Sequence, residues 1–428
     1  MFALHSEQAE RSGQARMHRR SNAVRTFPRA RAHWVISLLG LSACTGDTRN
    51  EAVTLTPVEN WTTEAEYQFG DRFEGDALFA LIVDVALGPS GSRVYVLDKQ
   101  ASEVTIWTPE GNLIKRFGQE GEGPGDFEAP GRFYLRDDAL VVRDWRGFTT
   151  FSLDGEFIVR DAIPPWVSWR GFSFSYESLL ADGSFLATPV VGGIVSEGLT
   201  GDDPMHEFPW LRVAQQAGSW VLDSVALESH RNTTIVFQGS GNTFGTFFDN
   251  PWIRPDACQG DETTGSVVCA RTQSMPPGVV GLVEVSVEGD TIWTRRVRLE
   301  PLPIEDQEYA AKVEWMASIV ARNRGGDSIA SPVMKRRVRE KLINPGFWPA
   351  IRGIRLMPNG EVWFRRLKDG ASHVWYAVRR GDAAGLRRIV LPEDFKPRYV
   401  NDTHVWGDRE DDMGVDYIAG LRLVRARE

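Results

Sequence analysis

Three aspartates stand at comparable places in the sequence, each at the end of a short run that is typical of a β-strand: Asp98, Asp144 and Asp408. Paired carboxylates can hold a divalent cation such as Ca²⁺, or act as general acid and base. An aspartate in this position is also typical of a turn cap, which accepts hydrogen bonds from nearby backbone N–H groups. We favour the turn cap and keep the cation site as the alternative.

Two further candidates for a ligand-binding face are Arg365 and His373, which lie beside and at the end of the expected loop 367–373. A catalytic metal usually needs several His or Cys ligands, and no H-x-x-x-H spacing occurs. The sequence also lacks a phosphate loop and a G-x-S-x-G nucleophile elbow. We therefore predict no metal site of the His or Cys type and no cofactor, with Ca²⁺ as the open alternative.

A basic cluster stands out in a chain whose formal net charge is −9: Lys335, Arg336, Arg337, Arg339 and Lys341. We interpret it first as a solvated helix face. The alternative is contact with an anionic ligand or with lipid head groups. The acidic balance of the whole chain makes nucleic acid a poor partner.

The elements that would position these residues are mostly strands, and one insertion at 303–347 is helical. Tyr309, Val313, Met316 and Val320 recur at helical spacing, and Ser331-Pro332 is typical of the start of a second helix. The rest of the chain repeats one pattern of four short β-rich runs at intervals of roughly 45 residues, the length of a propeller blade.

Six turns of the kind that open such a repeat are present, and they predict six blades. They lie at 89–91, 137–138, 181–183, between Cys258 and Cys269, at 357–360 and at 401–402. The last repeat ends at the C-terminus one strand short. Residues 66–70 resemble the end of the first complete repeat, so we expect this N-terminal strand to complete the last blade and close the ring.

The stretch 117–130 and the strand-Asp pattern at Asp98 and Asp144 resemble NHL-repeat-like six-bladed β-propellers. The resemblance runs from about residue 65 to the end. It is close in the first two and last two repeats, and weak over 189–250 and 303–347. It implies an all-β fold whose longer loops lie on one face, where binding sites usually evolve. Some propellers of this kind are metal-dependent lyases, but their His pattern is not matched here.

The N-terminus has the order of an export signal: an Arg-rich stretch at 11–33, an apolar run at 34–41, and then Leu41-Ser42-Ala43-Cys44. This resembles the lipobox of bacterial lipoproteins, in which Cys44 takes a diacylglycerol and residues 1–43 are removed. Met17 is an alternative start. Thr45 is compatible with outer-membrane sorting. We expect residues 44–64 to be a flexible tether and 65–428 to be the propeller.

Lipidation of Cys44 would leave two cysteines, Cys258 and Cys269. An exported protein meets an oxidising compartment, and the ten intervening residues allow the chain to reverse, so we predict a disulfide between them. The alternative is a pair of buried free thiols.

These observations favour a lipid-anchored binding or interaction protein of the bacterial envelope, in the periplasm or exposed at the outer membrane. It would use the loop-rich propeller face to hold a protein, peptide or small-molecule ligand. We expect a monomer that meets the membrane through its lipid alone. The alternative is an envelope enzyme, such as a lactonase, lyase or hydrolase, with the aspartates around a divalent cation. A structural ring that spaces other components is a third class.

Overall fold

The computed structural model describes residues 55–70, 78–164, 174–189, 205–231, 234–237, 246–323, 330–366, 373–381 and 385–426. Residues 53–428 form one compact unit. The predicted signal peptide, Cys44 and the first part of the predicted tether lie outside the described residues.

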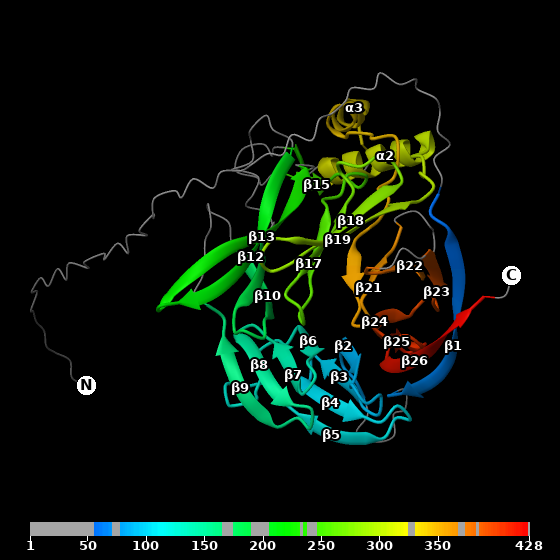
Figure 1. Cartoon of the computed structure of the whole chain (residues 1–428). Helices are drawn as coiled ribbons and strands as arrows, with labels where there is room; N and C mark the ends of the chain where they lie inside the picture. The colour runs from blue at the N-terminus through cyan, green and yellow to red at the C-terminus, as the bar shows by residue number, and fades with distance from the viewer. Residues whose placement is uncertain are drawn as a thin grey trace, which may run out of the picture. The chain divides into compact units, whose positions relative to one another are not determined.

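Four sheets each contain four antiparallel strands that follow one another along the chain (Figure 1). The first is β2 (Ile82–Leu87), β3 (Val94–Asp98), β4 (Glu103–Trp107) and β5 (Leu113–Phe117), and the second is β6 (Arg132–Leu135), β7 (Ala139–Arg143), β8 (Gly147–Ser152) and β9 (Phe157–Ala162). The third is β10 (Phe174–Leu179), β11 (Phe185–Pro189), β12 (Met205–Gln216) and β13 (Ser219–Arg231), and the fourth is β16 (Ala257–Gly260), β17 (Val267–Arg271), β18 (Val279–Val285) and β19 (Thr291–Arg298). The fold is therefore all-β and propeller-like.

The remaining long strands form a single eight-stranded sheet in the order β20-β21-β22-β23-β1-β26-β25-β24. Its members are β1 (Val58–Phe69), β20 (Ile354–Leu356), β21 (Glu361–Phe364), β22 (Val374–Arg379), β23 (Leu386–Val390), β24 (Lys396–Val400), β25 (His404–Glu410) and β26 (Asp416–Arg425). The expected pairing of residues 66–70 with the C-terminal strands is present, since Tyr67 lies opposite Gly420 in antiparallel register.

Two expectations need correction at this sheet. The first half of β1 also pairs in parallel with β23, with Val58 opposite Leu386, so the last two groups of strands are joined rather than separate. The described sheets therefore do not number six separate blades. In addition, β1 begins at Val58, so residues 58–64 of the expected tether are part of a strand. The reason is that residues 58–61 pair with β23 and residues 61–64 pair with β26, although most of their side chains face solvent.

Burial rises and then falls across each of the first two sheets. All five residues of β3 are buried, whereas β5 and β9 are mostly exposed or half-buried. A strand that is buried throughout is covered on both faces, so its side chains pack against the neighbouring sheets. Leu97, Ile106 and Leu140, for example, share one core cluster drawn from the first two sheets.

The predicted helices are present as α2 (Asp306–Asn323) and α3 (Pro332–Lys341). The Ser331 side chain caps α3 by accepting a hydrogen bond from the backbone N–H of Met334 at 3.2 Å. Both helices share a core with the two-stranded sheet of β14 (Thr234–Phe237) and β15 (Thr246–Asp249). Neither helix is long and apolar enough to cross a membrane, and the described residues contain no other that is.

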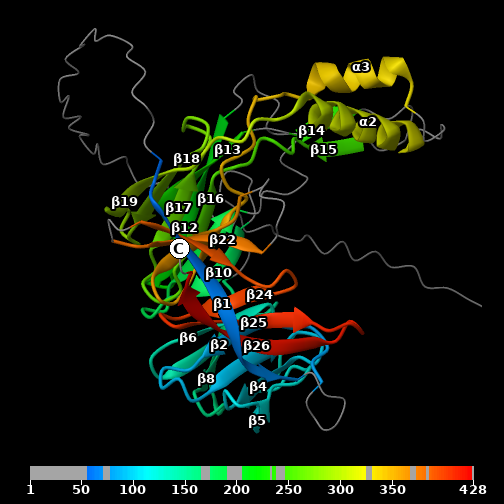
Figure 2. The ribbon, with the colours of Figure 1, turned by 90° about the vertical axis from the view of Figure 1, so that its right-hand side faces the viewer.

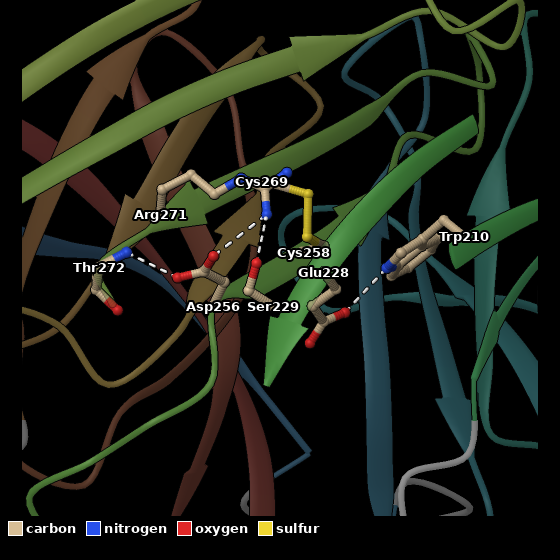
Figure 3. The surroundings of a disulfide bond; sticks show 8 residues. All are labelled: Trp210, Glu228, Ser229, Asp256, Cys258, Cys269, Arg271 and Thr272. Atoms are coloured by element: carbon tan, nitrogen blue, oxygen red, sulfur yellow. Dashed lines mark hydrogen bonds and ion pairs between the residues drawn. A yellow bond between two sulfur atoms is a disulfide. The ribbon is translucent and has the colours of Figure 1, made fainter. Parts of the chain in front are cut away.

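The predicted disulfide joins Cys258 in β16 to Cys269 in β17 (Figure 3). The two residues face each other in the register of the antiparallel pair, with their Cα atoms 4.0 Å apart. In the same region Arg271 forms an ion pair with Asp256 at 3.2 Å, and Trp210 donates to Glu228 at 3.0 Å (Figure 3). A disulfide of this kind is typical of proteins that fold outside the cytoplasm.

Candidate functional site

The first strands of five groups, β2, β6, β16, β20 and β24, line a cavity of about 820 Å³. β2 contacts both β6 and β24, and β16 contacts β20, so these strands adjoin one another around the cavity. A volume of this size suits a small-molecule ligand. The charged residues that line it are Arg132, Arg136, Arg352, Arg355, Arg365, Arg380, Arg398, Asp84, Asp137, Asp261 and Glu262.

Asp84, in β2, ties two lining strands together. Its carboxylate accepts hydrogen bonds from the backbone N–H groups of Val85 and Phe133, each at 3.1 Å. Burial raises the pKa of Asp84, and the nearby guanidiniums of Arg355 and Arg132 act in the opposite direction. Because both carboxylate oxygens are already bound by backbone amides, Asp84 holds the wall of the cavity in place.

Arg398, in β24, links its strand to β2 through hydrogen bonds. Its Nη1 and Nη2 atoms donate to the backbone carbonyls of Val83 and Ile82 at 2.9 and 3.3 Å. Its Nε donates to Asp408 at 2.6 Å, and the Lys396 ammonium lies 3.2 Å from the other carboxylate oxygen. Asp408 is fully buried. This aspartate thus belongs to an ion-pair network behind the cavity wall.

Acidic side chains also hold two other arginines of the cavity. Arg132 forms an ion pair with Glu262, which links the second and fourth sheets. Arg380 lies 2.7 Å from Asp261 and 2.9 Å from Glu284, which links β22 and its turn to the disulfide-bonded hairpin. These pairs draw separate sheets together around the cavity.

The cavity lining also includes Arg352 and Arg365. The Arg365 guanidinium lies 4.9 Å from the centre of the Trp375 ring, and the backbone N–H of Arg352 donates to the Arg365 carbonyl at 2.8 Å. Burial lowers the pKa of Arg365, and the charge of Arg352 lowers it further. Arg352 is exposed, and within the described ranges no carboxylate lies at ion-pair distance from it. Two neighbouring positive charges, one of them over an aromatic ring, form an arrangement to which an anion can bind.

Asp98 and Asp144 are turn caps. Asp98 accepts hydrogen bonds from the backbone N–H groups of Ala80, Leu81, Gln100 and Ala101 at 2.6 to 3.2 Å. Asp144 accepts from those of Glu128, Arg146 and Gly147 at 2.9 to 3.0 Å. Neither aspartate lines the cavity. The part of the chain that the structure describes contains no group of three His, Cys, Asp or Glu side chains that could hold a metal ion.

The other predicted residues are spread over the molecule. Arg365 lines the cavity, but His373 does not. The Nδ1 atom of His373 is buried and has no hydrogen-bond partner among the described residues. The basic cluster lies on α3, away from the cavity, where Lys335 pairs with Glu314 at 2.5 Å.

Four charged residues of the first strands were not predicted from the sequence: Asp84, Arg132, Arg355 and Arg398. Each stands in a run of three to six residues that is otherwise largely apolar or aromatic and precedes the opening turn of a repeat. Comparing the same strand across all repeats could have found them, because a charge is unusual at a repeated position in the middle of a fold.

No protein-family model and no curated protein sequence matches the chain. Among solved structures, a member of the DUF4221 family from Bacteroides vulgatus is 10% identical with a TM-score of 0.43, and the match covers 85% of this chain and 98% of that one. The calcium-binding protein regucalcin from Agrobacterium tumefaciens is 10% identical with a TM-score of 0.37, covering 87% and 98%. A PQQ-bound aldose sugar dehydrogenase from Streptomyces coelicolor is 12% identical with a TM-score of 0.33, covering 86% and 100%. We base no functional conclusion on similarities this low.

Proposed function

We propose that the protein is a binding protein of the bacterial envelope that holds a small anionic ligand in the central cavity. The observation that carries this proposal is Arg365 over the Trp375 ring with the charge of Arg352 nearby, in a cavity of about 820 Å³ with more arginines than acids in its lining. Three of the four lining acids, Asp84, Asp261 and Glu262, are already bound by backbone amides or arginines, and the fourth, Asp137, is exposed. Since the exposed Arg352 has no carboxylate at ion-pair distance among the described residues, its charge is available to an anionic ligand.

The anion proposal can be tested by thermal unfolding of residues 53–428 with citrate, inorganic phosphate or uncharged glucose. We expect citrate or phosphate to raise the unfolding temperature by a few degrees, on the order that a bound ligand produces at saturation, and glucose to have no effect. The double substitution Arg352→Gln and Arg365→Gln should abolish the shift.

A matched control removes two exposed arginines that do not line the cavity, Arg254→Gln and Arg296→Gln. This control should keep the full shift. An equal loss in both variants, or no shift with either anion, would overturn the proposal.

We also propose that the protein is a lipoprotein whose residues 1–43 are removed and whose Cys44 is acylated, with the body in the periplasm or exposed at the outer membrane. The lipobox-like sequence supports this, and the Cys258–Cys269 disulfide is consistent with an oxidising compartment. Detergent partitioning of the wild type against Cys44→Ala tests it. A wild-type protein that stays in the aqueous phase with residues 1–43 intact would refute it.

We propose further that the eight-stranded sheet works as two adjoining blades, with β1 as the outer strand of the last, giving six blades in all. The six opening hairpins and the β1–β26 pairing support this count. A chain that starts at residue 55 should be as stable as 53–428, whereas one that starts at residue 71 should aggregate through the freed sheet edges. Equal behaviour of the two truncations would remove this model.

A further inference from the structure

The helix α3 has one buried face and one exposed, strongly basic face. Met334, Val338 and Leu342 pack into the core shared with α2, at helical spacing. The opposite face carries Val333 and its neighbours, among which Arg336 and Arg337 are exposed. The helix holds five basic residues and one acidic residue, while the whole chain has a formal net charge of −9.

Part of this charge has no partner among the residues that the structure describes. Lys335 pairs with Glu314, and Arg336 lies 3.8 Å from Glu340 on the next turn. Arg337 and Arg339 are both exposed, and the described part of the chain places no carboxylate within ion-pair distance of either. A dense positive patch on an acidic protein repels itself unless an anionic surface faces it.

Apolar side chains stand exposed beside these charges. Val333 is 53% exposed at the start of α3, Ile343 is 49% exposed just after its end, and Phe347 is 38% exposed four residues later. A basic helix with exposed apolar side chains at its two ends is suited to the boundary between lipid head groups and acyl chains.

The position of α3 in the body agrees with this use. The backbone N–H of Thr56 donates to the Arg298 carbonyl at 2.9 Å, and Arg298 lies at the end of β19, shortly before α2 begins. Figures 1 and 2 both show α2 and α3 at the upper end of the ribbon with α3 outermost, and Figure 2 shows the start of β1 on the other side of the molecule.

We propose that α3 docks this end of the body onto an anionic lipid surface, with Arg337 and Arg339 on lipid phosphates and Val333 and Ile343 in the head-group boundary. The proposal is independent of the ligand in the cavity. It also holds without the lipid on Cys44, because it rests on residues of the folded body alone.

The test is flotation of residues 53–428 with vesicles of phosphatidylcholine, with or without about one third phosphatidylglycerol. We expect binding to the anionic vesicles at low salt and none to the neutral ones, with loss of binding as salt screens the charges. The pair Arg337→Gln and Arg339→Gln should weaken binding on the order of tenfold, since each basic residue near an anionic membrane contributes substantially to binding.

The matched control removes two exposed basic residues on other elements, Lys99→Gln and Arg296→Gln, and should bind like the wild type. The unfolding temperature of each variant is measured to check that its fold is intact. A second variant, Val333→Ser with Ile343→Ser, should weaken the binding that remains at moderate salt. Equal binding to neutral and anionic vesicles, equal losses in the α3 and control pairs, or no binding at all would each overturn the proposal.

Discussion

Asp98 and Asp408 occupy corresponding places in two different groups of strands, yet they are held in different ways. Each lies in the second strand of its group, opposite the first residue of the preceding strand: Ile82 for Asp98 and Lys396 for Asp408. Ile82 offers no side-chain donor, and Asp98 is bound by backbone amides. Lys396 and its neighbour Arg398 offer cations, and Asp408 is bound by these side chains.

The difference shows that a residue repeated along a repeat protein need not repeat its role. The residue that lies opposite in the register decides whether the carboxylate caps a turn or neutralises a buried cation. The regular spacing of aspartates in the sequence therefore predicts where the carboxylates lie. The residues of the first strand of each repeat determine what these carboxylates bind.

Removing the cation-bound aspartate should have the largest effect. Asp408→Ala leaves Arg398 and Lys396 without their counter-charge next to the cavity wall, and we expect the free energy of unfolding to fall by about 3–5 kcal/mol. Urea denaturation of residues 53–428 measures it. Adding Arg398→Met to Asp408→Ala should recover part of the lost free energy of unfolding. If nothing is recovered, the broken ion pair is not the cause of the loss.

Removing Asp98, which is bound by backbone amides, should lower the free energy of unfolding by a smaller amount. Asp98→Ala leaves buried backbone N–H groups without acceptors, and we expect a loss of about 2–3 kcal/mol. Asp98→Asn keeps one acceptor oxygen and should lose about half as much, whereas Asp408→Asn, which removes the charge, should lose nearly as much as Asp408→Ala. For each aspartate, the loss in free energy of unfolding of the Asn variant is compared with that of the Ala variant. If this ratio is the same at Asp98 and Asp408, the two aspartates are not bound in different ways.

The hairpin of β16 and β17 carries a third aspartate, Asp261, and is closed by the disulfide. Cys258→Ala with Cys269→Ala should lower the free energy of unfolding by about 2 kcal/mol, because the cross-link restricts the unfolded chain. Chemical denaturation with and without reductant gives the same comparison in the wild type. A variant as stable as the oxidised wild type would contradict this expectation.

Asp261 is bound both by backbone amides and by an arginine, and its substitution should change the free energy of unfolding least. Burial raises its pKa, but the Thr263 hydroxyl, the charge of Arg380 and backbone amides outweigh burial, so the pKa is lowered overall. A carboxyl with a lowered folded-state pKa stabilises the fold above its unfolded pKa of about 4, and this contribution is lost as the pH falls through the lowered value.

The stability difference between the wild type and Asp261→Asn should therefore be about 1 kcal/mol at pH 6 and shrink as the pH falls below about 4. Denaturation at a series of pH values, with Asp98→Asn measured alongside, provides the check. A difference that does not change with pH would show that the charge of Asp261 does not matter.

Much of the fold could be predicted because its signals are local. All six opening hairpins, the two helices and the disulfide follow from turn residues, helical spacing and compartment chemistry, and the structure confirms them. The parallel pairing of Val58 with Leu386 could not be predicted, because residues 58–61 resemble no strand of the repeat, whereas residues 66–70 resemble the end of the first complete repeat. The polar sequence at 58–64 is compatible with a flexible tether as well as with a strand, because a paired strand can still expose its side chains.

The cavity was predicted less well than the fold. Arg365 was found, but it was assigned to a loop-rich face rather than to a central cavity. Asp84 and Arg355 were missed because their meaning depends on strands from separate repeats meeting in the middle of the molecule. No pattern within a single repeat contains that information.

The position of β1 between β23 and β26 has a mechanical consequence. If the N-terminus is anchored, a pull on the body enters through β1, and its hydrogen bonds to both neighbours lie across the strand axis. A force along that axis loads these bonds together in shear instead of opening them one at a time. The body would then resist extraction from its anchor point more strongly than a domain tethered through an edge strand.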